Sequence, residues 1–86
     1  MTTIVNVTII HADGSPTTFQ CFEGFSEFLA RTESIIRRDG DPRGGVHLVF
    51  YYSVASKKLT QYLPTDILTL AKQAREMFSP ADDDSN

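Results

Sequence analysis

Residues 46–54, VHLVFYYSV, are the most strongly β-forming stretch of the chain. β-Branched and aromatic side chains dominate this stretch, and such residues are enriched in strands. Apolar residues also occupy both alternating sets of positions, which is typical of a strand in the middle of a sheet. The preceding residues 39–45, DGDPRGG, contain the glycines and the proline that end a helix and form a loop. We therefore place a central strand at residues 46–54 and assign the other elements around it.

Upstream of this strand, the sequence predicts a β-hairpin followed by a helix. Residues 3–11 and 17–22 have strand-like alternation, and residues 12–16, ADGSP, have turn chemistry. From Phe25 onward the apolar spacing changes to three and four residues, which predicts a helix over residues 25–38. Its apolar stripe consists of Phe25, Phe28, Leu29, Thr32, Ile35 and Ile36.

Downstream of the central strand, the same order of elements is predicted again. Residues 55–58 read as a turn and residues 59–63 as a fourth strand that ends at Pro64. A second helix is predicted over residues 66–78, with Thr65 as its N-cap. The buried stripe of this helix is expected to contain Ile67, Leu70, Ala71, Ala74, Met77 and Phe78.

The two halves of the chain therefore resemble each other. A shift of 41 positions places the alternating apolar residues of 5–9 on those of 46–50 without a gap. The predicted fold class is α+β with the order ββαββα, a weak internal duplication of a ββα unit. Two such units make one four-stranded antiparallel sheet with both helices packed on one face, which leaves the other face open.

Length and composition indicate one small globular domain. The chain has 86 residues, of which 41% are hydrophobic and 22% are charged. We expect the domain to span residues 1–78 and residues 79–86 to form a disordered acidic tail. The net charge of −3 owes much to residues 82–84, so the body of the domain is close to neutral. This balance is typical neither of a nucleic-acid-binding protein nor of an acidic DNA mimic.

The sequence also bears on the compartment. Cys21 is the only cysteine, so no intrachain disulfide can form, which suits the cytoplasm. The N-terminus lacks the charged start and apolar run of a signal peptide, and none is expected. The longest apolar run is far too short to span a bilayer, so no membrane association is predicted.

No set of residues has the spacing of a catalytic or metal site. His11, His47 and Cys21 are too far apart to resemble zinc ligands, which occur in closely spaced pairs. Cys21 falls within a predicted strand, where a lone cysteine is usually a small buried hydrophobic residue. Asp39 and Asp41 flank a glycine in ordinary turn chemistry. We therefore predict no catalytic residue, no metal and no cofactor, and we expect the protein not to be an enzyme.

Arg37, Arg38 and Arg43 form the only basic cluster of the sequence. Residues 43–50, RGGVHLVF, partly match the strand motif of RNA-recognition domains, which starts with Arg/Lys-Gly and continues with alternating aromatics. Three internal positions of the motif do not fit, and the order of elements differs. The simpler interpretation is that the arginines complement the end of a helix.

The open face of the sheet is the most promising candidate site. If the even-numbered residues of 46–52 face the helices, then His47, Val49 and Tyr51 face outward. Aliphatic residues together with Tyr and His are typical of a contact surface rather than a solvated face. We therefore predict partner binding by these three residues, with Arg37, Arg38 and Arg43 as a charged rim that steers association.

The predicted function is binding to a protein without catalysis. The most specific expectation is a small phage or mobile-element inhibitor of a host defence complex, similar in class to anti-CRISPR proteins, because small size and the absence of motifs are common among them. A homodimer formed through the open face is an equal possibility. The alternative is binding of RNA or single-stranded DNA through the open face and the arginines.

Overall fold

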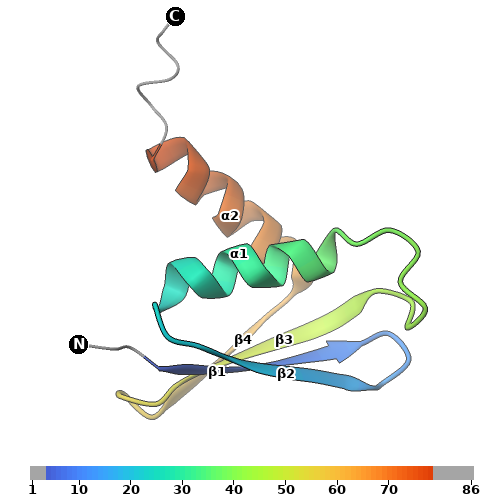
Figure 1. Cartoon of the computed structure of the whole chain (residues 1–86), viewed down its shortest axis with the longest axis horizontal. Helices are drawn as coiled ribbons and strands as arrows, with labels where there is room; N and C mark the ends of the chain where they lie inside the picture. Colours follow the sequence, from blue (N-terminus) through green and yellow to red (C-terminus); the bar gives the residue numbers. More distant parts are fainter. Residues whose placement is uncertain (1–3, 79–86) are drawn as a thin grey trace, which may run out of the picture.

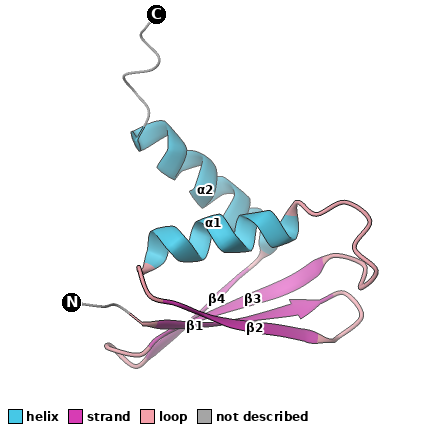
Figure 2. Ribbon diagram, in the orientation of Figure 1, coloured by secondary structure: helices cyan, strands magenta, loops and turns pink. Residues whose placement is uncertain are grey.

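A computed structural model describes residues 4–78, and its elements confirm the α+β class and the order ββαββα (Figure 1). Both helices lie on the same side of the sheet (Figure 2). The acidic tail predicted at residues 79–86 lies outside the described residues. The elements are β1 (Val5–His11), β2 (Pro16–Cys21), α1 (Phe25–Ile36), β3 (Val46–Ser53), β4 (Lys58–Tyr62) and α2 (Pro64–Phe78).

The sheet consists of two hairpins joined along their first strands. The strand order is β2-β1-β3-β4, and every neighbouring pair is antiparallel. The first hairpin turns at residues 12–15, where an Asp13 carboxylate oxygen accepts the Ser15 N–H at 2.8 Å and Gly14 has φ 89°. The central positions thus go to β1 and β3, which are the two most hydrophobic strands.

The pairing of β1 with β3 contains one irregularity. Ile10 lies opposite Leu48, whereas the next residue, His11, lies opposite Val46. His47 is therefore an extra residue in β3, as in a β-bulge. Because the side chains of a strand alternate between faces, one extra residue exchanges the two faces for the rest of the strand.

The bulge overturns the predicted orientation of β3. Val49 lies opposite Ile9 and Tyr51 opposite Val7, and both β1 residues are buried beneath the helices. Val49 and Tyr51 therefore face the helices, and the prediction that they face outward is wrong. The prediction carried one alternation through residues 46–52, whereas the chain changes phase at the bulge.

The core lies between the helices and the inner face of the sheet. Phe28 of α1 is fully buried at the centre of this core. The centroid of the Phe28 ring lies 4.7 Å from that of Tyr51 and 5.8 Å from that of Tyr62. The Phe28 and Tyr51 rings meet edge to face, an arrangement that aromatic pairs favour. The buried residues of this core are Val5, Val7, Ile9, Cys21, Phe28, Leu29, Val49 and Ile67.

The helix ends differ in detail from the predictions. α2 begins at Pro64, and Leu63 is its N-cap, because the Leu63 carbonyl accepts the Ile67 N–H at 3.3 Å. An Asp66 carboxylate oxygen accepts the Leu63 N–H at 2.9 Å, and proline suits the first helical position. Thr65 therefore lies inside the first turn and is not the N-cap. Met77, predicted to be buried, is 75% exposed.

A salt-bridged carboxylate joins the two helices. Glu33 of α1 accepts hydrogen bonds from Arg75 of α2 at 2.8 and 2.9 Å and from Arg37 at 2.9 Å. These bonds, Arg75 first, lower the pKa of the Glu33 carboxyl below its ordinary value. The carboxylate form of Glu33 thus holds α1 against α2.

The burial of Phe28 gives a direct test of the core. Phe28→Ala should lower the free energy of unfolding by about 3–5 kcal/mol, because it leaves a cavity beneath the helices. Met77→Ala, at an exposed position of α2, should change it by about 0.5 kcal/mol or less. Denaturant titration followed by circular dichroism measures both values. Equal effects of the two substitutions would contradict the described core.

The salt bridges of Glu33 with Arg75 and Arg37, which we call the Glu33 clamp, predict that the stability of the fold depends on pH. A carboxyl whose pKa is lowered by folding stabilises the fold above its unfolded pKa, about 4.3, and loses this contribution as the pH falls through its folded pKa. Glu33→Gln should therefore be less stable than the native chain at neutral pH, and the difference should shrink in acid. Glu76→Gln, which changes the net charge equally, serves as the control. A difference that stays constant with pH would contradict the clamp.

Candidate functional site

The sheet face that the helices leave bare is the candidate binding site (Figure 2). The strand register assigns to it the residues that alternate with the core, from all four strands. None of them is acidic or basic. We call this set the open face: Pro16, Thr18 and Gln20 of β2, Asn6, Thr8 and Ile10 of β1, Leu48, Phe50 and Tyr52 of β3, and Leu59 and Gln61 of β4.

The open face has a polar half and an apolar half. On β1 and β2, the Gln20 side-chain amide donates to the Asn6 side-chain oxygen at 2.8 Å. On β3 and β4, Leu59 lies opposite Tyr52 and is 60% exposed. We call Leu48, Phe50, Tyr52 and Leu59 the apolar half. A solvated strand face usually carries charged residues and threonine, whereas aliphatic and aromatic residues are typical of contact surfaces.

The predicted binding residues of β3 are divided by the bulge. His47 is exposed beside the open face, at the bulge itself. Val49 is fully buried. Tyr51 packs against Phe25 and Phe28, and burial raises the pKa of its phenol above the ordinary value. Val49 and Tyr51 therefore belong to the core, and their outward places are taken by Leu48, Phe50 and Tyr52.

The three arginines do not act as one cluster. Arg37 forms an ion pair with Glu33 on the helix layer. Arg43 donates to the Thr17 hydroxyl oxygen at 2.6 Å, and Arg38 lines a cavity next to it. Sequence proximity suggested a common surface, but the helix ends at Ile36 and the chain turns between these side chains.

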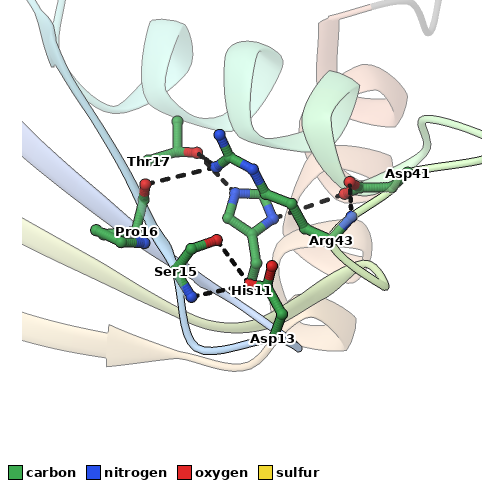
Figure 3. A network of polar contacts seen from close by, with 7 residues as sticks. All are labelled: His11, Asp13, Ser15, Pro16, Thr17, Asp41 and Arg43. Atoms are coloured by element: carbon green, nitrogen blue, oxygen red, sulfur yellow. Dashed lines mark hydrogen bonds and ion pairs between the residues drawn. The ribbon is translucent and has the colours of Figure 1, made fainter.

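Arg43 belongs to a polar cluster around His11 that sequence reasoning missed (Figure 3). His11 Nε2 lies 2.6 Å from the Thr17 hydroxyl oxygen, and His11 Nδ1 lies 3.6 Å from an Asp41 carboxylate oxygen. The side chains of His11 and Asp41 are only 4% and 7% exposed. The Arg43 N–H donates to Asp41 at 2.9 Å. A cavity of about 320 Å³ borders the cluster, with Arg38 on its wall.

The cluster joins the turn of the first hairpin to the loop before β3. The Ala12 N–H donates to the Gly45 carbonyl at 2.9 Å and the Asp13 N–H to the Arg43 carbonyl at 3.1 Å. An order of carboxylate, imidazole and hydroxyl is also found in hydrolytic triads. Here, however, the hydroxyl oxygen already accepts a guanidinium N–H, and 3.6 Å is too long for a carboxylate–imidazole hydrogen bond. The arrangement therefore acts as a latch between two loops, and we call it the His11 latch.

One sequence signal points to this latch. His11 continues the inward alternation of β1, so its imidazole had to be buried and had to find polar partners. The alternation did not identify those partners, because Asp41 lies 30 residues further along the chain.

The remaining candidate groups in residues 4–78 are the Cys21 thiol and the side chains that could ligate a metal. Burial, followed by the charge of Glu27, raises the pKa of the Cys21 thiol above its ordinary value, which lowers its thiolate fraction. Within this part of the chain, no group of three or more His, Cys, Asp and Glu side chains is placed to hold a metal ion. Neither α1 nor α2 combines the length and the apolar character that crossing a bilayer requires.

Comparison with protein-family models, with curated proteins and with solved structures gave no match. The assignment of a function to this chain therefore depends on the open face and the His11 latch themselves.

The latch predicts unequal effects of two neighbouring substitutions. Thr17→Val removes the hydroxyl that contacts both His11 and Arg43, and it should lower the free energy of unfolding by about 1–3 kcal/mol, because a buried imidazole nitrogen loses its partner. Thr18→Val, on the open face, should change it by about 0.5 kcal/mol or less. Thermal and denaturant unfolding measure both variants, and equal losses would contradict the latch.

Proposed function

We propose that the protein is a non-catalytic binding module whose open face docks on another protein. The observation that supports this proposal is a sheet face that no other part of residues 4–78 covers and that contains aliphatic and aromatic side chains and no charge. Tyr and Phe at the centre of such a surface offer a large contact area at low cost in side-chain entropy. The polar half, with Asn6 and Gln20, offers hydrogen-bonding groups that select among apolar partners.

The same observation favours a protein over a nucleic acid. Phe50 and Tyr52 could stack on bases, but single-stranded nucleic acids also require lysines or arginines along the backbone path. The open face has neither residue, while Arg37 and Arg43 are engaged within the fold. Binding of RNA or single-stranded DNA is therefore the second candidate, which the aromatic pair alone supports.

The most specific form of the proposal is inhibition of a host defence complex by a phage or mobile-element protein. It stays a prediction, because no residue of the open face indicates which protein the partner is. A cytoplasmic partner belongs to the same prediction.

The proposal predicts that Tyr52 and Phe50 dominate the affinity. The native chain, immobilised, should capture a specific protein from extracts of its source cells. Tyr52→Ala or Phe50→Ala should then weaken titrated binding of that protein by about 2 kcal/mol, or about 30-fold, because the centre of an interface contributes most. Met77→Ala, an exposed substitution on α2, should leave the affinity unchanged. Melting curves confirm that each variant is folded.

Salt separates the two candidate functions. Apolar docking should persist at about 1 M salt, whereas binding of a fluorescent oligonucleotide of uridine or thymidine should fall steeply with ionic strength. Tight, salt-sensitive binding of the oligonucleotide that is lost in Tyr52→Ala, without capture of any protein, would reject the protein-binding proposal.

A further inference from the structure

We infer that a second copy of this chain pairs with the free edge of β4, antiparallel, around a two-fold axis at Thr60. This inference rests on the sheet edges and is independent of what the open face binds. An antiparallel pair of identical strands requires the axis to stand perpendicular to the sheet. The helices of both copies then lie on one side, and the sheet continues from one copy into the other.

The edge of β2 is closed to such pairing. Pro16 has no N–H to offer. The Gln20 carbonyl accepts a hydrogen bond from Arg31 at 2.9 Å, and the Pro16 carbonyl accepts one from Arg43 at 3.5 Å. Arg31 is held in this place by Glu27 at 3.1 Å and by the ring of Phe19, whose centroid lies 4.3 Å from the guanidinium carbon. Side chains that cover edge carbonyls prevent the addition of a further strand.

The edge of β4 is free by comparison. β4 pairs with β3 along one side. Within residues 4–78, no side chain forms a hydrogen bond to the backbone of residues 58–62, and neither does any backbone group outside the sheet. A strand edge with unpaired N–H and C=O groups is a template for another strand.

The charges at this edge match those of a second copy. A cavity of about 430 Å³ lies between β4 and α2, and its wall includes Tyr62 and the acidic residue Asp66. Burial, followed by the charge of Asp66, raises the pKa of the Tyr62 phenol. The electrostatic field of the Asp66 carboxylate therefore extends to Tyr62 at the edge of the sheet. With the axis at Thr60, Lys58 of the second copy lies opposite Tyr62, on the helix side of the sheet. Its ammonium group then enters the acidic cavity, and the symmetry repeats this contact at the other end.

The same register separates the two copies of Lys58 and brings the apolar halves of the two open faces together. The two copies of Lys58 are separated by about 14 Å along the strands, since each residue advances about 3.4 Å. The apolar half of each open face borders β4, so the two apolar halves meet at the centre of a continuous eight-stranded face. Each β4 edge thus carries both a cation, Lys58, and an acidic acceptor, Asp66, at the separation that this register requires. Such an edge fits a second copy of itself better than an unrelated strand.

Cysteine cross-linking tests the register. Thr60→Cys places two thiols on the axis with Cα atoms about 5 Å apart, within the range of a disulfide. It should give a covalent dimer under mild oxidation, whereas Lys58→Cys, on the same strand, should not. The native Cys21 is fully buried and leaves the experiment undisturbed. Non-reducing electrophoresis and sedimentation equilibrium of the native chain measure the outcome.

Charge reversal tests the contact with Asp66. Lys58→Glu should raise the dimer dissociation constant about tenfold or more, with a smaller effect at high salt. Asp66→Asn should act in the same direction while keeping an acceptor for the Leu63 N–H. The double variant Lys58→Glu/Asp66→Lys should recover dimerisation, provided that its circular dichroism shows the native fold.

Two results would overturn the inference. One is a native chain that sediments as a monomer at about 0.5 mM and a Thr60→Cys variant that does not cross-link. The other is a dimer that Lys58→Glu leaves unchanged but Tyr52→Ala dissociates, which would place the interface on the open face. The first result leaves the capture of another protein through Tyr52 unaffected, so failure of this inference is distinguishable from failure of the proposed function. The second result would make a second copy of this chain the partner of the open face.

Discussion

The position of one extra residue in β3 determines what each face of this sheet contains. His47 is inserted between the residues that oppose Ile10 and His11, so the chain enters β3 with Val46 inward and leaves the bulge with the opposite phase. Val49 and Tyr51 thereby join the core, while Phe50 and Tyr52 face away from the helices. Without the extra residue, the same strand would bury Phe50 and expose Tyr51. The core under Phe28 and the open face therefore both depend on this one local feature.

The charges of the described residues are distributed unevenly between the two sides of the sheet. The salt bridges of Glu27 and Glu33 lie on the helix layer, and the charged partners of His11 lie in the loops at one end of the sheet. The open face has only uncharged side chains. Hydration of the molecule therefore depends mainly on the helix layer, because ionised groups hold water far more strongly than threonine or glutamine. The opposite side has no ionised groups, so contact with a partner costs it little free energy of desolvation. This low cost is the physical basis of the proposed function.

The sequence predicted the order and type of the elements correctly because these are local properties. The change from alternating to helical spacing after Gly24, and the turn residues around Gly14, act within a few residues. The face assignment of β3 was wrong because a bulge arises from the pairing of strands that are distant in the chain. The capping error at Thr65 is small by comparison, since Pro64 directly beside it already suits the start of a helix. Of the three β3 residues predicted to bind a partner, Val49 and Tyr51 shared this error of orientation, whereas His47 is exposed.

The His11 latch lies next to the bulge. The buried polar contacts of the latch therefore influence which residues of β3 occupy the open face. His11 is the last residue of β1 and lies opposite Val46, immediately before the extra residue. The latch binds Asp41 and Arg43, so it fixes where the loop ends and where β3 enters the sheet. A shift of that entry by one residue would move the bulge and exchange the inward and outward residues of β3. The polar cluster at the loop end of the sheet thus holds the register that displays Phe50 and Tyr52 on the face away from the helices.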